Sequence, residues 1–254
     1  MKALILAAGY ATRLRPLTES IAKPLLPVGG RPMVEWILER IAETSADEVH
    51  LVTNARFAPD FERWADGKDV QVHNDGTTSN EDRLGAIGDI RFVLERTGLA
   101  EDDLFVIAGD NLLDAPLAEY VSWWRRKDEA SAVAVYDVGD LELARHYGIV
   151  ELADDGRLLA FVEKPTDPPS TLAATATYVF HREHVALVEP YLAEGNPPDQ
   201  PGNFLAWLHR RRPVYGYVLS GEWYDIGTPD QLLEADNRLR ARAGLPSRAE
   251  YALD

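Results

Sequence analysis

The N-terminal segment reads KALILAAGYATRLRPLTESIAKPLLPVGGRPM from residue 2 onward, and it joins an apolar run to a loop that carries cations. The run predicts a buried strand over 3–7, which ends in small residues. The loop behind it contains Gly9, Thr12, Arg13 and Lys23. Short side chains let backbone N–H groups approach an anion, and the two cations supply fixed positive charge. The segment therefore predicts a phosphate site at the end of a strand.

Strand and helix patterns alternate through the first half of the chain. Such alternation predicts an α/β fold whose mixed, mostly parallel sheet has helices on both faces and binds ligands at the carboxyl ends of its strands. The expected strands are 3–7, 48–53, 70–73, 104–108 and 132–138, and the expected helices are 32–41, 58–64, 85–94 and 118–126, with a polar loop over 74–83.

The second half is less regular. Residues 149–152 and 158–162 predict a hairpin around the turn Asp154-Asp155-Gly156. Thr228 is expected to cap the last helix, and the tail after Gly244 is expected to fray. The remaining expected elements are strands at 174–180 and 214–219, helices at 181–192, 204–210 and 229–242, and a proline-rich loop at 196–201.

Composition excludes several classes of protein. The formal net charge of −16 argues against a nucleic-acid footprint, which needs a basic face. No apolar run approaches the roughly 20 residues of a membrane span, and the six residues between Lys2 and Gly9 form too short an apolar region for a secretory signal. With no cysteine in 254 residues, a cytoplasmic protein is expected. An acidic chain that binds phosphates must gather its cations locally or use a metal.

The N-terminal segment resembles the signature of sugar-1-phosphate nucleotidylyltransferases. That pattern is roughly G-x-G-T-R-L-x-P-L-T followed by P-K-P-L-L-P-V, and this chain reads GYATRLRPLT and AKPLLPV. Ala11 replaces a glycine of the pattern, and Ala22 replaces a proline. If the loop needs a positive φ at residue 11, alanine adopts it less readily than glycine. A βα turn with a solvated arginine and lysine is the alternative, which the length of the ordered match disfavours.

The resemblance covers about residues 2–240 and implies further site residues. Arg13 and Lys23 would be catalytic, stabilising the α-phosphate and the departing pyrophosphate. The nucleotide would be bound by Leu6, Ala8, Gly9, Thr12, Arg13, Asn80, Gly85 and Asp110.

Two aspartates are implied as ligands of Mg²⁺. Gly109-Asp110-Asn111 follows an expected strand, where a carboxylate can hold Mg²⁺ against phosphate oxygens. It resembles the family's G-D-N, and residues 223–229, WYDIGTP, resemble W-x-D-x-G-T-P. Asp110 and Asp225 would therefore be both metal ligands and catalytic residues. A carboxylate favoured by the dipole of the last helix is an alternative role for Asp225.

The sugar phosphate is implied to bind in the second half. Residues 161–165, FVEKP, resemble F-x-E-K-P, so catalytic Lys164 would hold the phosphate and Glu163 would accept hydrogen bonds from sugar hydroxyls. Gly148, in YGIVE, would bring its N–H close to a hydroxyl. Thr175, in ATATY, completes this implied set. The alternative is an exposed hairpin with an incidental Glu-Lys pair.

The nucleobase is implied to lie beside residues 84–88, LGAIG, which resemble L-G-T-A-G. The family has Gln five residues before the first glycine, where this chain has Asn80. An amide can read a pyrimidine edge, but asparagine is one methylene shorter, and Asn80 as a plain loop residue stays open.

The resemblance implies a Rossmann-like single domain over 1–242 with a C-terminal tail over 243–254. A nucleotide-binding half would cover about 1–138, and a sugar-phosphate-binding half, with a small sugar-binding β subdomain, about 139–227. Longer family members continue into an acyltransferase domain, and we expect that activity to be absent.

The implied reaction transfers a nucleotidyl group from a nucleoside triphosphate to a sugar 1-phosphate and releases pyrophosphate. Ala174 stands where the family's N-acetylhexosamine enzymes tend to carry asparagine, which favours a plain hexose. Together with G-D-N, the resemblance therefore favours glucose 1-phosphate with dTTP or UTP. Mannose 1-phosphate with GTP, an alcohol phosphate with CTP and a non-catalytic paralogue that binds sugar nucleotides remain alternatives. The expected partners are these small molecules, without nucleic acid or membrane, and a homo-oligomer is left open.

Overall fold

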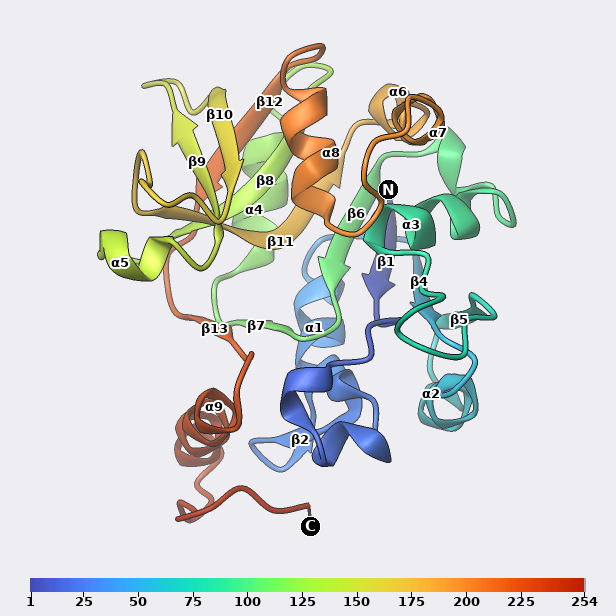
Figure 1. Cartoon of the computed structure of the whole chain (residues 1–254), viewed down its shortest axis with the longest axis vertical. Coiled ribbons are helices and arrows are strands. Elements are labelled where there is room, and N and C mark those ends of the chain that lie inside the picture. Colours follow the sequence, from blue (N-terminus) through green and yellow to red (C-terminus); the bar gives the residue numbers. More distant parts are fainter. Residues whose placement is uncertain (254) are drawn as a thin grey trace.

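A sheet of nine strands runs through the part of the chain that this computed structural model describes, residues 1–253 (Figure 1). Seven strands follow the order β10-β9-β11-β6-β1-β4-β5, and β8 lies between β11 and β12. The bounds are β1 (Lys2–Leu6), β4 (Glu48–Thr53), β5 (Gln71–Asn74), β6 (Leu104–Ala108), β8 (Ser131–Asp137), β9 (Gly148–Leu152), β10 (Leu158–Glu163), β11 (Leu172–Phe180) and β12 (Val214–Val218).

The sheet changes character at β11. The four strands β6, β1, β4 and β5 are parallel to one another, as the alternation predicts. β11 runs antiparallel to β6, β8 and β9, and the hairpin of β9 and β10 completes the second half. The predicted mixed α/β sheet is confirmed, and the ends of β1 and β6 meet at one edge because Leu6 pairs with Ala108.

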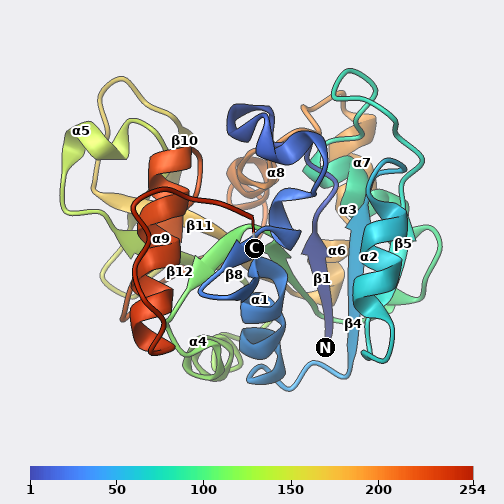
Figure 2. The same cartoon turned by 90° about the horizontal axis from the view of Figure 1, so that it is seen from below.

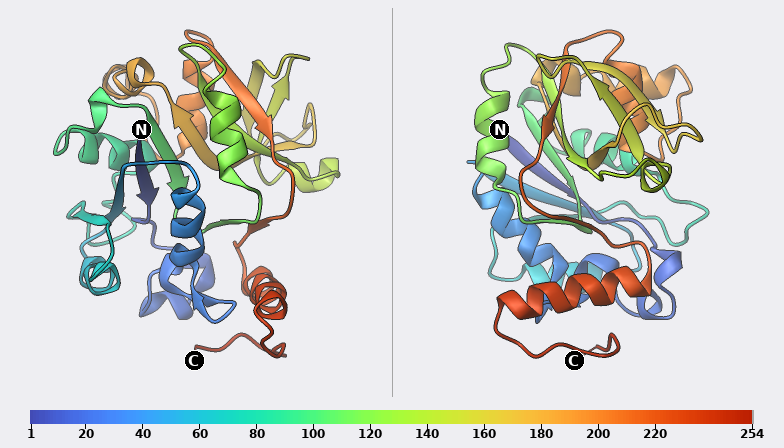
Figure 3. Two further views of the ribbon diagram at one scale, coloured as in Figure 1. Left: turned by 180° about the vertical axis from the view of Figure 1, so that it is seen from behind. Right: turned by 90° about the vertical axis from the view of Figure 1, so that its left-hand side faces the viewer.

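Helices cover both faces of the sheet. Figure 1 looks onto α3 and α8, whereas the left panel of Figure 3 looks onto α1 (blue) and α4 (green). Residues along a strand alternate between the two layers: Ile5 packs with the α1 side and Leu4 with the α3 side. The helices are α1 (Met33–Ala42), α2 (Ala58–Ala65), α3 (Ala86–Leu94), α4 (Leu117–Trp124), α5 (Leu141–Ala144), α6 (Arg182–Val185), α7 (Val188–Ala193), α8 (Pro201–Leu208) and α9 (Pro229–Arg242).

A third apolar cluster joins α9 to the N-terminal loop. Leu232 and Leu239 of α9 pack with Leu14 and Leu26, residues more than 200 positions earlier in the chain. Figure 2 shows α9 beside this blue N-terminal segment and α1. Two short ribbons complete the fold: β2 (Pro27–Val28) with β3 (Arg31–Pro32), and β7 (Asn111–Leu113) with β13 (Trp223–Asp225).

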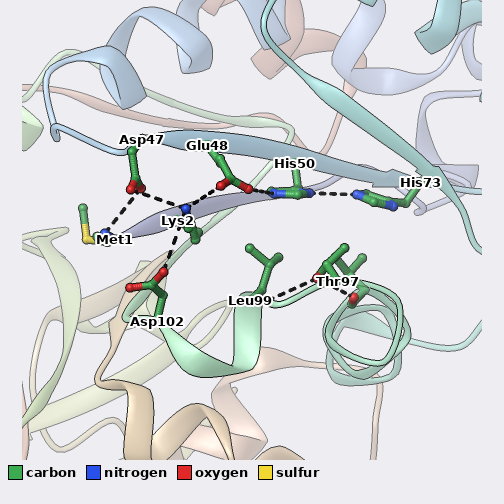
Figure 4. A network of polar contacts seen from close by, with 10 residues as sticks. Met1, Lys2, Asp47, Glu48, His50, His73, Thr97, Leu99 and Asp102 are labelled. Carbon is green, nitrogen blue, oxygen red and sulfur yellow. Dashed lines mark hydrogen bonds and ion pairs between the residues drawn. The ribbon is translucent and has the colours of Figure 1, made fainter.

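A polar network ties the amino-terminal edge of the sheet together, away from the phosphate loop (Figure 4). Lys2 Nζ lies 2.5 Å from Glu48 Oε1 and 3.9 Å from Asp102 Oδ2. His50 Nε2 lies 3.3 Å from Glu48 Oε2, and its Nδ1 lies 2.9 Å from His73 Nε2. Burial, with the neighbouring His50, lowers the pKa of His73 to about 4. The network therefore joins β1, β4 and β5 through neutral imidazoles.

Two expectations were wrong in detail, and one element was missed. The helix expected over 181–192 is split into α6 and α7, because Pro190 has no N–H to offer the carbonyl four residues earlier. α8 begins at Pro201, inside the loop expected over 196–201, because proline suits the first turn of a helix. The short ribbon β7–β13 was not anticipated.

We expected the C-terminal tail to fray, but it is hydrogen-bonded to the rest of the chain. Arg240 Nε donates to Pro246 O at 2.6 Å, and Tyr251 Oη donates to Pro27 O at 2.8 Å. These contacts fold the tail back on α9 and β2. Residue 254, the last of the expected tail, lies outside the described residues. The expected cap is confirmed, since Gln231 N donates to Thr228 Oγ1 at 3.3 Å.

Candidate active site

The phosphate loop follows β1 and is held in an open form. Ala11 has φ 44°, in the left-handed region, and Thr18 Oγ1 donates to its carbonyl at 2.8 Å. The positive φ confirms that this alanine stands where glycine would be less strained. A Cβ built on Gly9 would have no neighbour within 4 Å, so its backbone faces open space. Thr12 is exposed beside it. This loop can therefore present backbone donors to an anion.

Leu6 and Ala8 connect the strand to the loop, and both are less exposed than Thr12. Leu6 is half-buried at the end of β1, and Ala8 is 5% exposed. Asn54 Nδ2 donates to the carbonyl of Ala8 at 2.9 Å, which fixes the loop to the end of β4.

Lys23 and Asp110 form an ion pair beneath this loop. Lys23 Nζ lies 2.5 Å from Asp110 Oδ2, and 39% of the aspartate side chain remains exposed. Gly109 N donates to Leu6 O at 2.8 Å, which holds Asp110 at the common end of β1 and β6. Burial tends to raise the pKa of Asp110, but the charge and hydrogen bond of Lys23, with a contribution from Arg13, lower it below its ordinary value. Asp110 is thus an anion at neutral pH.

Asp225 reaches the same place from the other end of the chain. It pairs with Asn111 across the ribbon β7–β13, so the two aspartates lie on neighbouring strand ends. Burial raises the pKa of Asp225 and the Asp110 carboxylate adds to this, against the charges of Lys23 and Arg13. A Cβ on Gly227 would lie 3.1 Å from Arg13 Nη1, so the guanidinium packs beside this turn.

A cavity of about 570 Å³ opens beside these charges. Arg13, Asp110 and Asp225 line it together with Glu163 and Lys164 of the second half. Four of the five residues predicted as catalytic on resemblance alone thus border one cavity, and the fifth, Lys23, is bonded to one of them.

Lys164 and Gly148 are held by the local backbone of the hairpin. Lys164 is exposed, has φ 45° and donates its N–H to Tyr147 O at 2.9 Å. A Cβ on Gly148 would lie 2.5 Å from Phe161 Cζ and 2.9 Å from Glu163 Oε2. Glycine at 148 therefore leaves room for that ring and for the carboxylate that lines the cavity. Burial raises the pKa of Glu163.

Thr175 also borders the cavity, but its side chain is otherwise engaged. Its hydroxyl donates to Ala134 O at 3.0 Å, its carbonyl accepts from Asn111 Nδ2, and the residue is 1% exposed. Its hydroxyl therefore stabilises β11 against β8 rather than facing a ligand.

Asn80 and Gly85 lie outside the described lining of this cavity. Asn80 belongs to a loop built on side-chain caps: Asp82 accepts hydrogen bonds from the backbone and hydroxyls of Thr78 and Ser79 at 2.8–3.2 Å. Gly85 has φ 80° and precedes α3. The loop sequence NDGTTSNEDR thus encodes a chain of turns that ends at the first turn of α3.

Several residues of the cavity wall escaped the sequence prediction. Tyr147 and Trp223 were quoted only as motif letters, yet their rings lie 5.2 Å apart. Burial, with the charge and hydrogen bond of Asp225, raises the pKa of Tyr147 to about 12. Asn111 accepts from Trp223 Nε1 at 2.6 Å. Gln200 stands in a proline-rich loop that carries no signal of a site.

The two carboxylates fit a magnesium ion better than a structural metal. Within residues 1–253 no group of three or more histidine, cysteine, aspartate or glutamate side chains could hold a metal. Mg²⁺ usually takes one or two protein carboxylates and completes its shell with waters and substrate phosphates. Asp110 and Asp225 beside an anion-binding loop match that donor set.

No helix of the described chain is long and apolar enough to pass through a bilayer.

A family model described as nucleotidyl transferase matches residues 2–242. The chain is 32% identical over 243 residues to a UTP–glucose-1-phosphate uridylyltransferase of Synechocystis sp., covering 91% of this chain and 61% of the relative. It is 33% identical over 248 residues to a mannose-1-phosphate guanylyltransferase of Mycobacterium tuberculosis, covering 97% and 66%. A glucose-1-phosphate thymidylyltransferase of Streptomyces griseus is 31% identical over 245 residues, covering 94% and 66%. The chain thus spans about three fifths of the length of such relatives.

Solved structures share the fold. One described as a Bacillus anthracis glucose-1-phosphate thymidylyltransferase in complex with sucrose has a TM-score of 0.80 at 24% identity, covering 94% of this chain and 95% of that one. A UDP-glucose pyrophosphorylase complexed with UDP-glucose has a TM-score of 0.79 at 24% identity, covering 95% and 98%. These likenesses show that the sheet and its helices have the same Rossmann-like fold.

Proposed function

Because the chain belongs to the nucleotidyl transferase family, we propose that it transfers a nucleotidyl group from a nucleoside triphosphate to a sugar 1-phosphate and releases pyrophosphate. The observation that carries this proposal is the meeting of opposite charges at one cavity. Arg13 and Asp110 reach it from the N-terminal half, whereas Lys164 and Asp225 reach it from the C-terminal half.

The residues act by positioning and by neutralising charge. A phosphate oxygen of the acceptor attacks the α-phosphorus in line, so no protein nucleophile is required. Arg13 and the backbone donors around Gly9 stabilise the negative charge that builds up on the triphosphate. Lys164 holds the acceptor phosphate, and Glu163 orients its sugar hydroxyls. Lys23 keeps Asp110 ionised and in place.

Asp110 and Asp225 are the proposed holders of Mg²⁺. A bound magnesium ion would neutralise phosphate oxygens of both reactants. The proximity of two carboxylates in an otherwise cationic corner supports this assignment, because each anion raises the free energy of the other unless a cation lies between them.

Glucose 1-phosphate with dTTP or UTP is the proposed substrate pair. Ala174, which borders the cavity, favours a plain hexose over an N-acetylhexosamine on resemblance. The proposed partners are these small molecules, in the cytoplasm, and the net charge of −16 is consistent with the absence of nucleic acid among them.

A panel of triphosphates against sugar and alcohol phosphates, scored by pyrophosphate release, tests the proposal. We expect the highest kcat/KM for glucose 1-phosphate with dTTP or UTP. The best rate with mannose 1-phosphate and GTP, or with an alcohol phosphate and CTP, would replace the substrate pair and keep the reaction. Binding of a sugar nucleotide without release of pyrophosphate from any pair would refute the enzyme and support a non-catalytic paralogue.

A further inference from the structure

One segment of the chain touches both the implied nucleobase side and the acceptor side of the site. Residues 197–202, called the strap below, run from α7 into the first turn of α8 and pass beside α3 (Figure 1). Three strap residues border the cavity, namely Gln200, Pro201 and Gly202.

The strap is fixed to the start of α3 at its nucleotide end. Ile87 N donates to Pro198 O at 2.8 Å, and Ala86 N donates to Asp199 O at 3.3 Å. The strap carbonyls thereby satisfy two of the N–H groups that open this helix. A Cβ on Gly85 would lie 2.7 Å from Pro198 O, so the two backbones are in close contact.

At its other end the strap contacts two residues of the acceptor side, Glu163 and Phe161. The side-chain amide of Gln200 faces the Glu163 carboxylate, and donor must meet acceptor there, which assigns the amide nitrogen to that side. In this orientation the nitrogen lies 2.8 Å from Oε1 and 3.3 Å from Oε2. Gly202 packs so closely on Phe161 that a Cβ there would overlap the ring. Glu163 is half-buried, and an amide donor on both of its oxygens fixes the direction of the carboxylate.

The strap is stiff where it approaches α3. Pro197 and Pro198 restrict the backbone, and Tyr191 Oη donates to Pro197 O at 2.7 Å from α7. The residues bonded to α3, Pro198 and Asp199, directly precede Gln200, which faces the Glu163 carboxylate. A shift of Glu163 on acceptor binding would therefore be passed to the first turn of α3.

We propose that the strap couples the acceptor and nucleotide subsites, and that Gln200 is the positioning residue that aims Glu163 at the acceptor. The proposal rests on the proposed function, whose acceptor and nucleotide sites it connects. Each substrate orders the strap that the other needs, so binding of one raises the affinity for the other.

The first experiment replaces Gln200 by methionine, which keeps the length of the side chain and loses the donor. We expect KM for the sugar phosphate to rise about 5- to 20-fold, as for the loss of a hydrogen bond to a charged group, while kcat stays within about 2-fold. Gln71→Met, on the exposed strand β5, is the control and should match the parent protein. An unchanged KM for the sugar phosphate in Gln200→Met would overturn the positioning role.

The second experiment measures the coupling itself. The affinity of a non-hydrolysable triphosphate analogue is measured by calorimetry with and without sugar phosphate. We expect the sugar phosphate to raise this affinity about 5-fold or more in the parent chain, within the usual range of coupling between sites. The double variant Pro197→Gly/Pro198→Gly should bring that ratio close to one.

Two further variants keep this result interpretable. Pro213→Gly, in an exposed loop, controls for general loosening, and Asp199→Ala removes only the pairing with Arg83, which lies 3.1 Å away, and should lower the ratio less. A ratio of one in the parent chain, or an undiminished ratio in the folded double variant, overturns the coupling. Failure of every pair in the pyrophosphate panel overturns the function instead, so the two failures are distinguishable.

Discussion

Arg13 is the guanidinium that the phosphate loop contributes to the cavity. Arg13→Ala should lower kcat/KM by about 10²–10³-fold or more, because a charge contact made in the transition state is lost. Steady-state kinetics with the best substrate pair measures the effect.

Arg15 provides the matched control for that substitution. It is exposed two residues further along the same loop and is absent from the lining of the cavity. Arg15→Ala should therefore keep near-native turnover. Near-native turnover in Arg13→Ala would remove Arg13 from the proposed mechanism.

Asp89 and Asp75 form a buried pair of carboxyl groups near the implied nucleobase side. Asp89 is 6% exposed, and one oxygen of each residue is buried with no hydrogen-bond partner assigned among residues 1–253. Burial, with the charge and hydrogen bond of Asp75, raises the pKa of Asp89 to about 8. A protonated Asp89 that donates to Asp75 satisfies both orphan oxygens and ties the loop over 74–83 to α3.

This pair makes stability depend on pH. The pKa of Asp89 is raised on folding, so the folded chain binds more protons than the unfolded chain between about pH 4 and pH 8. The pair therefore lowers stability as pH rises through that window, by up to about 1.4 kcal/mol per pH unit.

Asp89→Asn should flatten that dependence, because an amide donates to Asp75 at every pH. The melting temperature of the variant should match the parent at pH 5 and exceed it by several degrees at pH 9, measured by thermal unfolding. Asp128→Asn, an exposed aspartate, is the control. Parallel pH profiles for Asp89→Asn and the parent chain would disprove the shared proton.

At the scale of elements, one buried amide links the ribbon β7–β13 to the sheet. Asn111 accepts from Trp223 Nε1 at 2.6 Å and donates to Thr177 Oγ1 at 2.7 Å and to the carbonyl of Thr175. It thus bonds the strand of Asp225 to β11, and it is 5% exposed. The ribbon, which contains Asp225 and directly follows Asp110, is bonded to the sheet through this residue.

Asn111→Ala should loosen the ribbon. It leaves buried donors and acceptors unpaired, at a cost of about 1–3 kcal/mol for each group, and it should also lower kcat because Asp225 loses its support. Chemical denaturation and kinetics together measure the two effects. Trp223→Phe removes only one of these bonds and should lose less. Full stability in Asn111→Ala would show that the ribbon is held by other contacts.

Sequence predicts the elements of this fold best where the local pattern alone decides them. Apolar runs and helical spacing identify β1, β4, β6 and α1 to within one or two residues, because each buries its own regular face. The ribbon β7–β13 is set by pairing between residues more than 100 positions apart, which no local pattern encodes.

The residues of the candidate site likewise fall into those with a signal in the sequence and those that only the fold reveals. Arg13 and Lys23 carry a local signal, and resemblance supplied Asp110, Lys164 and Asp225, which the fold brings to one place. Gln200 could not be predicted, since its relation to Glu163 exists only in three dimensions. Thr175 has the right place but uses its hydroxyl within the sheet. The other assigned roles, and the boundary near residue 138, stay predictions.

At the scale of the whole molecule, removal of the metal should abolish activity without unfolding the chain. The apolar clusters lie on both faces of the sheet and under α9, whereas the proposed magnesium ligands stand at its edge. A chelator should therefore abolish pyrophosphate release, and added Mg²⁺ should restore it, while the melting temperature without substrates stays unchanged. A chelator-induced fall in melting temperature would indicate a structural metal, and full activity in excess chelator would contradict the proposed role of Asp110 and Asp225.

Phe161 packs against two glycines that also line the acceptor cavity, Gly148 of β9 and Gly202 of α8. Its ring fills the space into which a side chain at Gly148 or Gly202 would extend. Evolutionary drift at these three positions is consequently constrained jointly: a lineage that gains a methyl group at 148 or 202 can keep its packing only by shrinking the residue at 161. Among related sequences we therefore expect substitutions at positions 148, 161 and 202 to be correlated.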